Sequence, residues 1–256
     1  MIQPILANAA VYAIENATTE GKITCLVLLV LSLFSWTIII TKFRQLTIAR
    51  RATKKFMAAY SSTRDPLDIK KRGEDFDGAP AYALYERGAE ELAFQLEKNP
   101  VTVKGERRIS LSSYEAVKVV LEEAASAQAM SLEKGMIVLS TAVAGGPFIG
   151  LLGTVWGVMS TFAGIAASNS ASLTAMAPGV AAALVATVTG LLVAIPAMFA
   201  YNFMVTTVRA ITQELDGFAS RYANQIEHAY VDNRDIEDKI AWALTRVEMG
   251  ENTPAI

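Results

Sequence analysis

The most informative absence in this sequence is that of ionisable side chains over one long stretch. Residues 135–208, which are 74 consecutive positions, contain no Asp, Glu, Lys, Arg or His. A second run, residues 23–41, is uncharged over 19 positions. The helices of a water-soluble domain need a polar face, so these runs exclude an ordinary soluble enzyme. They indicate an integral membrane protein that also has water-exposed parts.

Cysteine and histidine each occur only once. Cys25 cannot form an internal disulfide and lies in an apolar run, and His228 alone cannot make a metal site. The net charge of −2 provides no general attraction for nucleic acid. Residues 42–134 contain no nucleophile–base set, metal motif or phosphate-binding loop. The sequence therefore predicts no metal, cofactor, nucleic-acid partner or enzymatic activity.

The two uncharged runs predict three membrane crossings. Residues 23–41 form the first, because 19 helical residues span about 28 Å, close to the roughly 30 Å hydrocarbon core. The 74-residue run is too long for one crossing and is interrupted by a polar, turn-prone segment at 168–176. We expect the second crossing at 135–167 and the third at 177–205.

Basic residues predict the orientation, because Lys and Arg concentrate on the cytoplasmic side of membrane proteins. Residues 42–134 hold 17 of the 23 Lys and Arg residues. We therefore expect a cytoplasmic helical domain there and a cytoplasmic C-terminal helix and tail at 206–256. The N-terminus, 1–22, and the loop at 168–176 are then periplasmic. The predicted fold is an all-α integral membrane protein with long cytoplasmic helical extensions.

Local signals predict the elements of the cytoplasmic region. Residues 80–98 have helical periodicity that ends at Asn99-Pro100, and residues 70–78 resemble a loop. Ser112 and Glu115 match a capping box. We expect the helix that begins there to continue unbroken beyond Lys134 into the second crossing.

Small residues and hydroxyls mark the second and third crossings. Glycines at helical spacing let helix backbones approach closely in lipid, either within one copy or between copies. Thr154 and Thr161 share one face of the second crossing, and Thr187 lies on a stripe of the third with Ala183 and Gly190. Such a stripe suits a water-accessible or protein-facing lumen. The alternative is that these threonines only bond the carbonyls of their own helices.

Intramembrane acids and bases usually mark proton pathways, and the second and third crossings have none. If this chain takes part in proton conduction, the titrating carboxylate must come from another protein. Three helices are also too few to surround a sizeable path, so a channel would need several copies.

Three motifs resemble the TolQ/ExbB/MotA proton-channel family, and its TolQ members most closely. They are residues 35–40 (SWTIII), residues 147–159 (PFIGLLGTVWGVM) and residues 177–197 (APGVAAALVATVTGLLVAIPA). They cover all three crossings in the correct order, whereas the cytoplasmic region matches only in length and charge. Three crossings and a large cytoplasmic region fit the TolQ/ExbB branch better than a flagellar stator.

The resemblance implies a multi-pass protein of the bacterial inner membrane that assembles as a homopentameric ring. The ring would surround a TolR/ExbD-like single-span partner that carries a pore aspartate. By motif position, the resemblance assigns Thr154 and Thr187 to the lumen. Further candidates for the lumen are Thr161, Thr189, Ala183 and Gly190.

One position departs from the family pattern: Ala182 stands where the family often has a glutamate. The change leaves open an altered proton route, an altered partner, loss of proton passage, or loss of a dispensable residue. The leading hypothesis is a stator subunit that couples the proton motive force to work at the cell envelope. The alternative is a non-conducting membrane scaffold with the same pentameric architecture.

Overall fold

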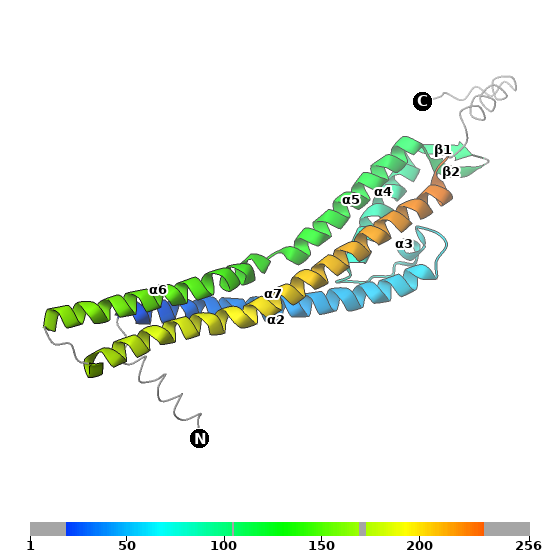
Figure 1. The fold of residues 1–256 in the computed structure, drawn as a ribbon. Helices are drawn as coiled ribbons and strands as arrows, with labels where there is room; N and C mark the ends of the chain where they lie inside the picture. Colours follow the sequence, from blue (N-terminus) through cyan, green and yellow to red (C-terminus); the bar gives the residue numbers. More distant parts are fainter. Residues whose placement is uncertain (1–18, 104, 169–172, 233–256) are drawn as a thin grey trace. The chain divides into compact units, whose positions relative to one another are not determined.

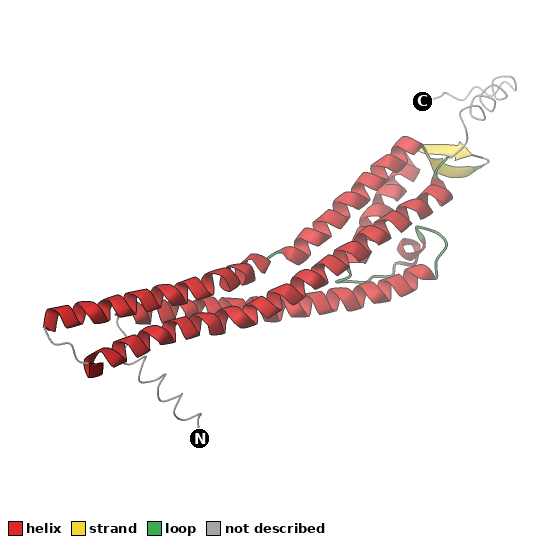
Figure 2. Ribbon diagram, viewed as in Figure 1, coloured by secondary structure: helices red, strands yellow, loops and turns green. Residues whose placement is uncertain are grey.

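The computed structural model describes residues 19–103, 105–168 and 173–232, which are mostly helical (Figures 1 and 2). The chain divides into two compact units. Unit 1 comprises residues 1–48 and 129–211, and unit 2 comprises residues 49–128 and 212–256. In order, the elements are α2 (Thr19–Ser61), α3 (Asp68–Arg72), α4 (Pro80–Lys98), β1 (Pro100–Val103), β2 (Glu106–Ile109), α5 (Leu111–Glu133), α6 (Met136–Ser168) and α7 (Leu173–Tyr230).

Unit 1 contains the apolar parts of the three long helices α2, α6 and α7. Among the described residues, these three helices are long and apolar enough to cross a membrane, with mean hydropathies of 2.6, 1.8 and 2.2 over their best windows. Large apolar side chains lie on the outside of each helix, as a lipid or protein environment requires. Examples are Phe34 on α2, Phe148 on α6 and Phe199 on α7, which are 62%, 71% and 68% exposed.

The expectation of one unbroken helix from residue 112 through Lys134 is wrong. α5 ends at Glu133, α6 begins at Met136, and Gly135 between them has a φ of +87°. A left-handed glycine is a common way to end a helix, because it has no Cβ to clash there. Lys42 of α2 stabilises this end by donating from Nζ to the carbonyl oxygens of Ser131, at 3.4 Å, and Leu132, at 3.0 Å.

The capping box predicted at Ser112 is also displaced. The hydroxyl of Ser110 accepts a hydrogen bond from the backbone N–H of Ser113 at 3.2 Å, so Ser110 is the residue that caps α5. Glu115 is paired with Lys118, at 3.1 Å, instead of reaching back to the cap.

The third crossing and the first part of the expected C-terminal helix form one element. α7 runs from Leu173 to Tyr230 with Pro178 and Pro196 inside it. The remainder of the expected helix and tail, residues 233–256, and most of the expected periplasmic N-terminus lie outside the described residues.

Unit 2 contains α4 at its predicted bounds and three elements that the sequence reasoning missed. α3 occupies part of the segment expected to be a loop, and β1 and β2 form an antiparallel hairpin that pairs Pro100 with Ile109. Ile109 also forms a parallel bridge with Val231, just after α7. Strands of four residues are too short for an alternating pattern to stand out in a sequence.

Aromatic rings fill the core of unit 2. Phe56 of α2 is fully buried, and its ring centroid lies 5.4 Å from that of Phe218 and 5.6 Å from that of Tyr85. Tyr222 is fully buried as well, with its centroid 5.1 Å from that of Tyr85. Because α2, α4 and α7 all contribute rings, this cluster joins segments that are distant in the sequence.

Replacing Phe56 with alanine is expected to destabilise unit 2 by about 3–5 kcal/mol, because it removes a fully buried ring and leaves a cavity. Thermal unfolding in detergent, combined with hydrogen exchange of α4 amides, measures the loss. Phe94→Ala is the matched control, since Phe94 is 51% exposed. Equal losses for the two variants would contradict the assignment of the core.

Unit 2 is also expected to lose stability between about pH 10 and pH 12. Burial raises the pKa of Tyr85 to about 12, while an unfolded chain releases a tyrosine proton near pH 10. Stability from the neutral phenol is therefore complete below pH 10 and decreases as pH rises toward 12. Circular dichroism melting from pH 8 to 12 should show a smaller alkaline loss for Tyr85→Phe than for the wild type; identical losses would exclude this tyrosine as a cause.

Candidate functional site

α6 and α7 are in close antiparallel contact through small residues. The space available for a Cβ at each glycine measures this contact: a Cβ at Gly150 would lie 2.9 Å from the carbonyl oxygen of Ala186, and one at Gly190 would lie 2.6 Å from that of Gly146. Further along α6, a Cβ at Gly157 would lie 2.7 Å from the Cβ of Ala183. Each glycine therefore lets one backbone rest on the other, which is how helices associate where apolar burial gives no driving force.

The first helix packs against the same seam. A Cβ at Gly153 of α6 would lie 2.9 Å from the Cγ2 of Thr24 on α2. By contrast, Gly145 has no atom within 4 Å of its Cβ position. Most of the α6 glycines named above therefore pack against another helix of the same chain, whereas Gly145 faces away from the other helices.

The α6–α7 contact brings Thr154 and Thr187 together. Their hydroxyls are hydrogen-bonded to each other although they are 33 positions apart in the sequence. The Thr154 hydroxyl is also 3.1 Å from the carbonyl oxygen of Gly150 and 3.2 Å from that of Ala183, and the Thr187 hydroxyl is 3.3 Å from the Gly150 oxygen. Both side chains are half-buried. This cluster of two hydroxyls and two carbonyls is called the threonine pair site below.

The threonine pair site can rearrange its hydrogen bonds but cannot hold a charge. Each hydroxyl has one proton to donate and two acceptor positions. Three neighbouring oxygens compete for the Thr154 proton and two for the Thr187 proton. No Asp, Glu, Lys, Arg or His lies between residues 135 and 208 to exchange a proton with these hydroxyls. The site can bind water or a protonated guest group, but it cannot carry a proton by titration.

The other two threonines predicted for the lumen do not join this cluster. Thr161 donates to the carbonyl oxygen of Gly157, and Thr189 donates to that of Val185, each at 2.8 Å and four residues back on its own helix. This is the local bonding that the alternative interpretation anticipated. A lumen requires more than one copy of the chain, so a role for these threonines in a lumen stays a prediction.

Alanine and glycine candidates lie in the interior of unit 1. Ala183 is 3% exposed and packs against Gly157, and Gly190 is buried against Gly146. Ala182, where the resemblance leads us to expect a glutamate, is 9% exposed. A carboxylate at position 182 would therefore occupy a largely buried place even in a single copy. The contribution of Ala183 and Gly190 to a lumen also stays a prediction.

Sequence reasoning missed one member of the site, the carbonyl of Gly150. This oxygen lies near both threonine hydroxyls, because Gly150 is four residues before Thr154 and lies directly against Thr187. The first relation could be found from spacing alone, whereas the second requires the register of two helices. Within the described residues, no cluster of His, Cys, Asp and Glu could hold a metal ion.

Gly150→Ala is expected to lower the stability of unit 1 by about 1–3 kcal/mol, because the added methyl group forces α6 away from α7. Gly145→Ala is the matched control on the same helix. Its methyl group meets open space, so it should be neutral or stabilising by about 0.5–1 kcal/mol. Thermal melting of the two variants in detergent should give shifts of opposite sign, and a shared sign would argue against the close backbone contact.

Comparison with known proteins places this geometry in a family. The family model for the MotA/TolQ/ExbB proton channel family matches residues 93–217, which include α5, α6 and most of α7. The chain is 31% identical over 215 residues to the Tol-Pal system protein TolQ of Haemophilus influenzae, covering 81% of this chain and 89% of that protein.

Two further relatives are similar over comparable lengths of this chain. The biopolymer transport protein ExbB of Pseudomonas putida is 33% identical over 196 residues, which are 76% of this chain but 56% of that protein. ExbB of Neisseria meningitidis is 32% identical over 204 residues, covering 75% of this chain and 85% of that protein. With its three apolar helices, the chain therefore belongs to the MotA/TolQ/ExbB proton channel family.

Proposed function

We propose that this protein is the stator subunit of a proton-driven motor in the bacterial inner membrane. Five copies surround a TolR/ExbD-like single-span partner, and proton flow through the assembly performs work at the cell envelope. The observation that carries the proposal is the threonine pair site: a proton channel family member holds two hydroxyls at the seam of α6 and α7 and has no titratable acid or base between residues 135 and 208.

Because residues 135–208 have no Asp, Glu, Lys, Arg or His, the proposal gives proton binding to the partner and the lining of the path to this chain. No side chain between residues 135 and 208 can bind and release a proton near neutral pH, so the partner's aspartate takes up the proton and releases it inside the ring. Thr154 and Thr187 then line the path and offer hydroxyls to the aspartate in either protonation state. About 100 mV of membrane potential supplies roughly 2.3 kcal/mol for each charge moved, so a few protons can drive a discrete shift of partner against ring.

The orientation follows from the basic residues. Residues 42–134 hold 17 of the 23 Lys and Arg residues, so unit 2 faces the cytoplasm and the α6–α7 connection faces the periplasm. The N-terminus is then periplasmic and the C-terminus cytoplasmic. Thr161 lies between the threonine pair site and the periplasmic end of α6, and Thr189 lies on the other side of the pair along α7; both extend the polar lining of the lumen.

One observation favours the alternative of a non-conducting scaffold. Ala182 replaces the glutamate that the family often carries, which removes one carboxylate from every copy of the ring. A scaffold would keep the glycine-mediated helix packing and the oligomer but would pass no protons. Purification with a single-span protein that carries an intramembrane aspartate favours the motor, whereas a ring purified without such a companion favours the scaffold.

Thr154→Val and Thr187→Val are expected to reduce proton uptake by the purified complex by about tenfold or more, since each removes a hydroxyl while keeping the side-chain volume. A pH-sensitive dye inside sealed proteoliposomes under an applied potential measures the uptake. Thr141→Val and Thr206→Val are the matched controls: these exposed threonines bond only to Ile137 and Asn202 of their own helices. Intact-mass measurement verifies that all four variants form the same complex.

Two results would reject the motor proposal. One is full proton uptake in both hydroxyl-deleted variants, which would remove the threonine pair site from the pathway. The other is rapid proton uptake by vesicles that contain this chain alone, because the chain would then conduct without a partner acid.

A further inference from the structure

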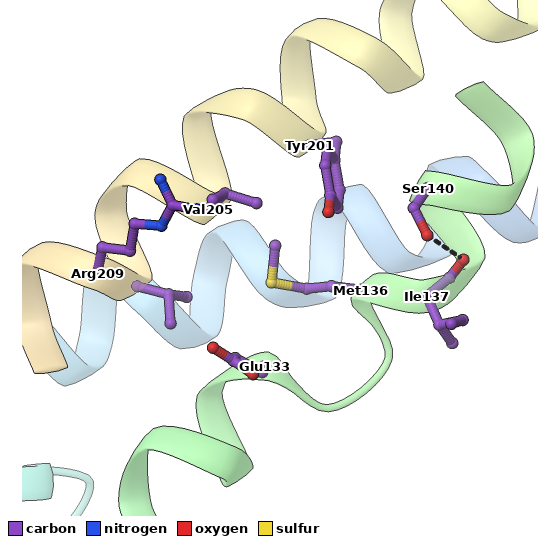
Figure 3. Close-up of a pocket in the computed structure, with 8 residues that line it drawn as sticks. Glu133, Met136, Ile137, Ser140, Tyr201, Val205 and Arg209 are labelled. Atoms are coloured by element: carbon purple, nitrogen blue, oxygen red, sulfur yellow. Dashed lines mark hydrogen bonds between the residues drawn. The ribbon is translucent and has the colours of Figure 1, made fainter. Parts of the chain in front are cut away.

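A second polar site lies in unit 1, about four turns or more from the threonine pair site along α6 and α7. A pocket of about 320 Å³ is formed by the end of α5, the first turns of α6 and the middle of α7 (Figure 3). Glu133 and Arg209 lie toward one end of the pocket, and Tyr201 and Ser140 lie toward the other. We call this the boundary pocket, because Arg209 directly follows the long uncharged run of the sequence and Glu133 lies two residues before its first position, Gly135.

The boundary pocket is graded from charged to apolar. From Arg209 to Tyr201, α7 rises about 12 Å, at 1.5 Å for each residue. The charged residues therefore lie at the aqueous end, and the hydroxyls lie about two turns deeper. Ile137 and, further along α6, Phe148 are 75% and 71% exposed, so large apolar side chains lie on the outside of α6 beside and beyond the pocket.

The two charged side chains of the pocket, Glu133 and Arg209, form no ion pair with each other or with any other side chain in the part of the chain that the structure describes. The Ser140 hydroxyl donates to the carbonyl oxygen of Ile137 at 2.9 Å and can still accept a hydrogen bond. An anion and a cation at one end of a cavity, with hydroxyls at the other, suit a zwitterion that is attached to an ester.

We propose that the boundary pocket binds the headgroup of an aminophospholipid such as phosphatidylethanolamine. Arg209 binds the phosphate, Glu133 binds the ammonium group, and the hydroxyls of Tyr201 and Ser140 contact the glycerol ester region. The acyl chains follow the exposed apolar surface of α6. Arginine recognises phosphate oxygens through its planar, forked donors, and a carboxylate accepts hydrogen bonds from an ammonium group.

The size and charge of the pocket favour this ligand over others. Its volume is near the lower limit of the about 300–1,000 Å³ typical of small-molecule sites, which suits a headgroup with its chains outside. Phosphatidylglycerol offers a phosphate for Arg209 but no cation for Glu133. A soluble phosphoethanolamine offers both charges but leaves the apolar surface of α6 uncovered. The proposal needs the membrane location and does not need proton passage, so the two can fail separately.

Native mass spectrometry of the detergent-purified protein tests the proposal, because it reports both bound lipid and oligomer mass. The protein is titrated with phosphatidylethanolamine, with phosphatidylglycerol of the same chains, and with free phosphoethanolamine. The wild type should retain phosphatidylethanolamine preferentially. Arg209→Gln should weaken binding of both lipids by about tenfold, equivalent to roughly 1.4 kcal/mol, and Glu133→Gln should abolish only the preference for phosphatidylethanolamine.

Arg44→Gln is the matched control. Arg44 is an exposed arginine three residues after the uncharged run 23–41 of α2, and it does not line the pocket. It should retain lipid as the wild type does. An equal loss in this variant would show general attraction to charge and overturn the proposal. Preference for phosphatidylglycerol, or equal binding of free phosphoethanolamine, would overturn it too. A smaller oligomer for Arg209→Gln with unchanged lipid would assign the pocket to contact between copies.

Discussion

The close approach of the α6 and α7 backbones is the constraint on which the rest of unit 1 depends. Lipid offers no hydrophobic force to hold two apolar helices together, so their association needs direct van der Waals contact between backbones. Gly150, Gly157 and Gly190 allow that contact because a Cβ at any of them would overlap the opposite helix. The same register places Thr154 beside Thr187, so the polar site is a consequence of glycine packing.

The C-terminal end of α5, which precedes the apolar helix α6, is held by a contact with α2. A glycine with positive φ separates α5 from α6, and the ammonium group of Lys42 binds the last carbonyls of α5. A cation at this place satisfies acceptors that the helix itself leaves open. Lys42 is 7% exposed, so this contact is part of the interior. A basic residue that marks orientation in the sequence also has a structural role.

The packed part of α6 and α7 and the ionisable residues lie in different places along these helices. Carboxylates inside a membrane are costly and are kept where they function. This chain has none between residues 135 and 208, and the contact between α6 and α7 is made by small and hydroxylated residues. Glu133 and Arg209, which lie just outside that run, line a separate pocket. The threonine pair and the boundary pocket are therefore distinct in both position and chemistry.

The sequence by itself determined the number of apolar helices, the extent of α4 and the two threonines of the site, because hydropathy, helical period and motif are local properties. It did not determine the break at Gly135, the cap at Ser110 or the β1–β2 hairpin, since one glycine, one of several neighbouring serines and two strands of four residues give weak local signals. Only the tertiary structure decided that the Gly150 carbonyl lies near both threonine hydroxyls, that Ala183 and Gly190 are interior, and that Glu133 and Arg209 line one pocket. These relations depend on the register of one helix against another, which is set by contacts between residues far apart in the chain.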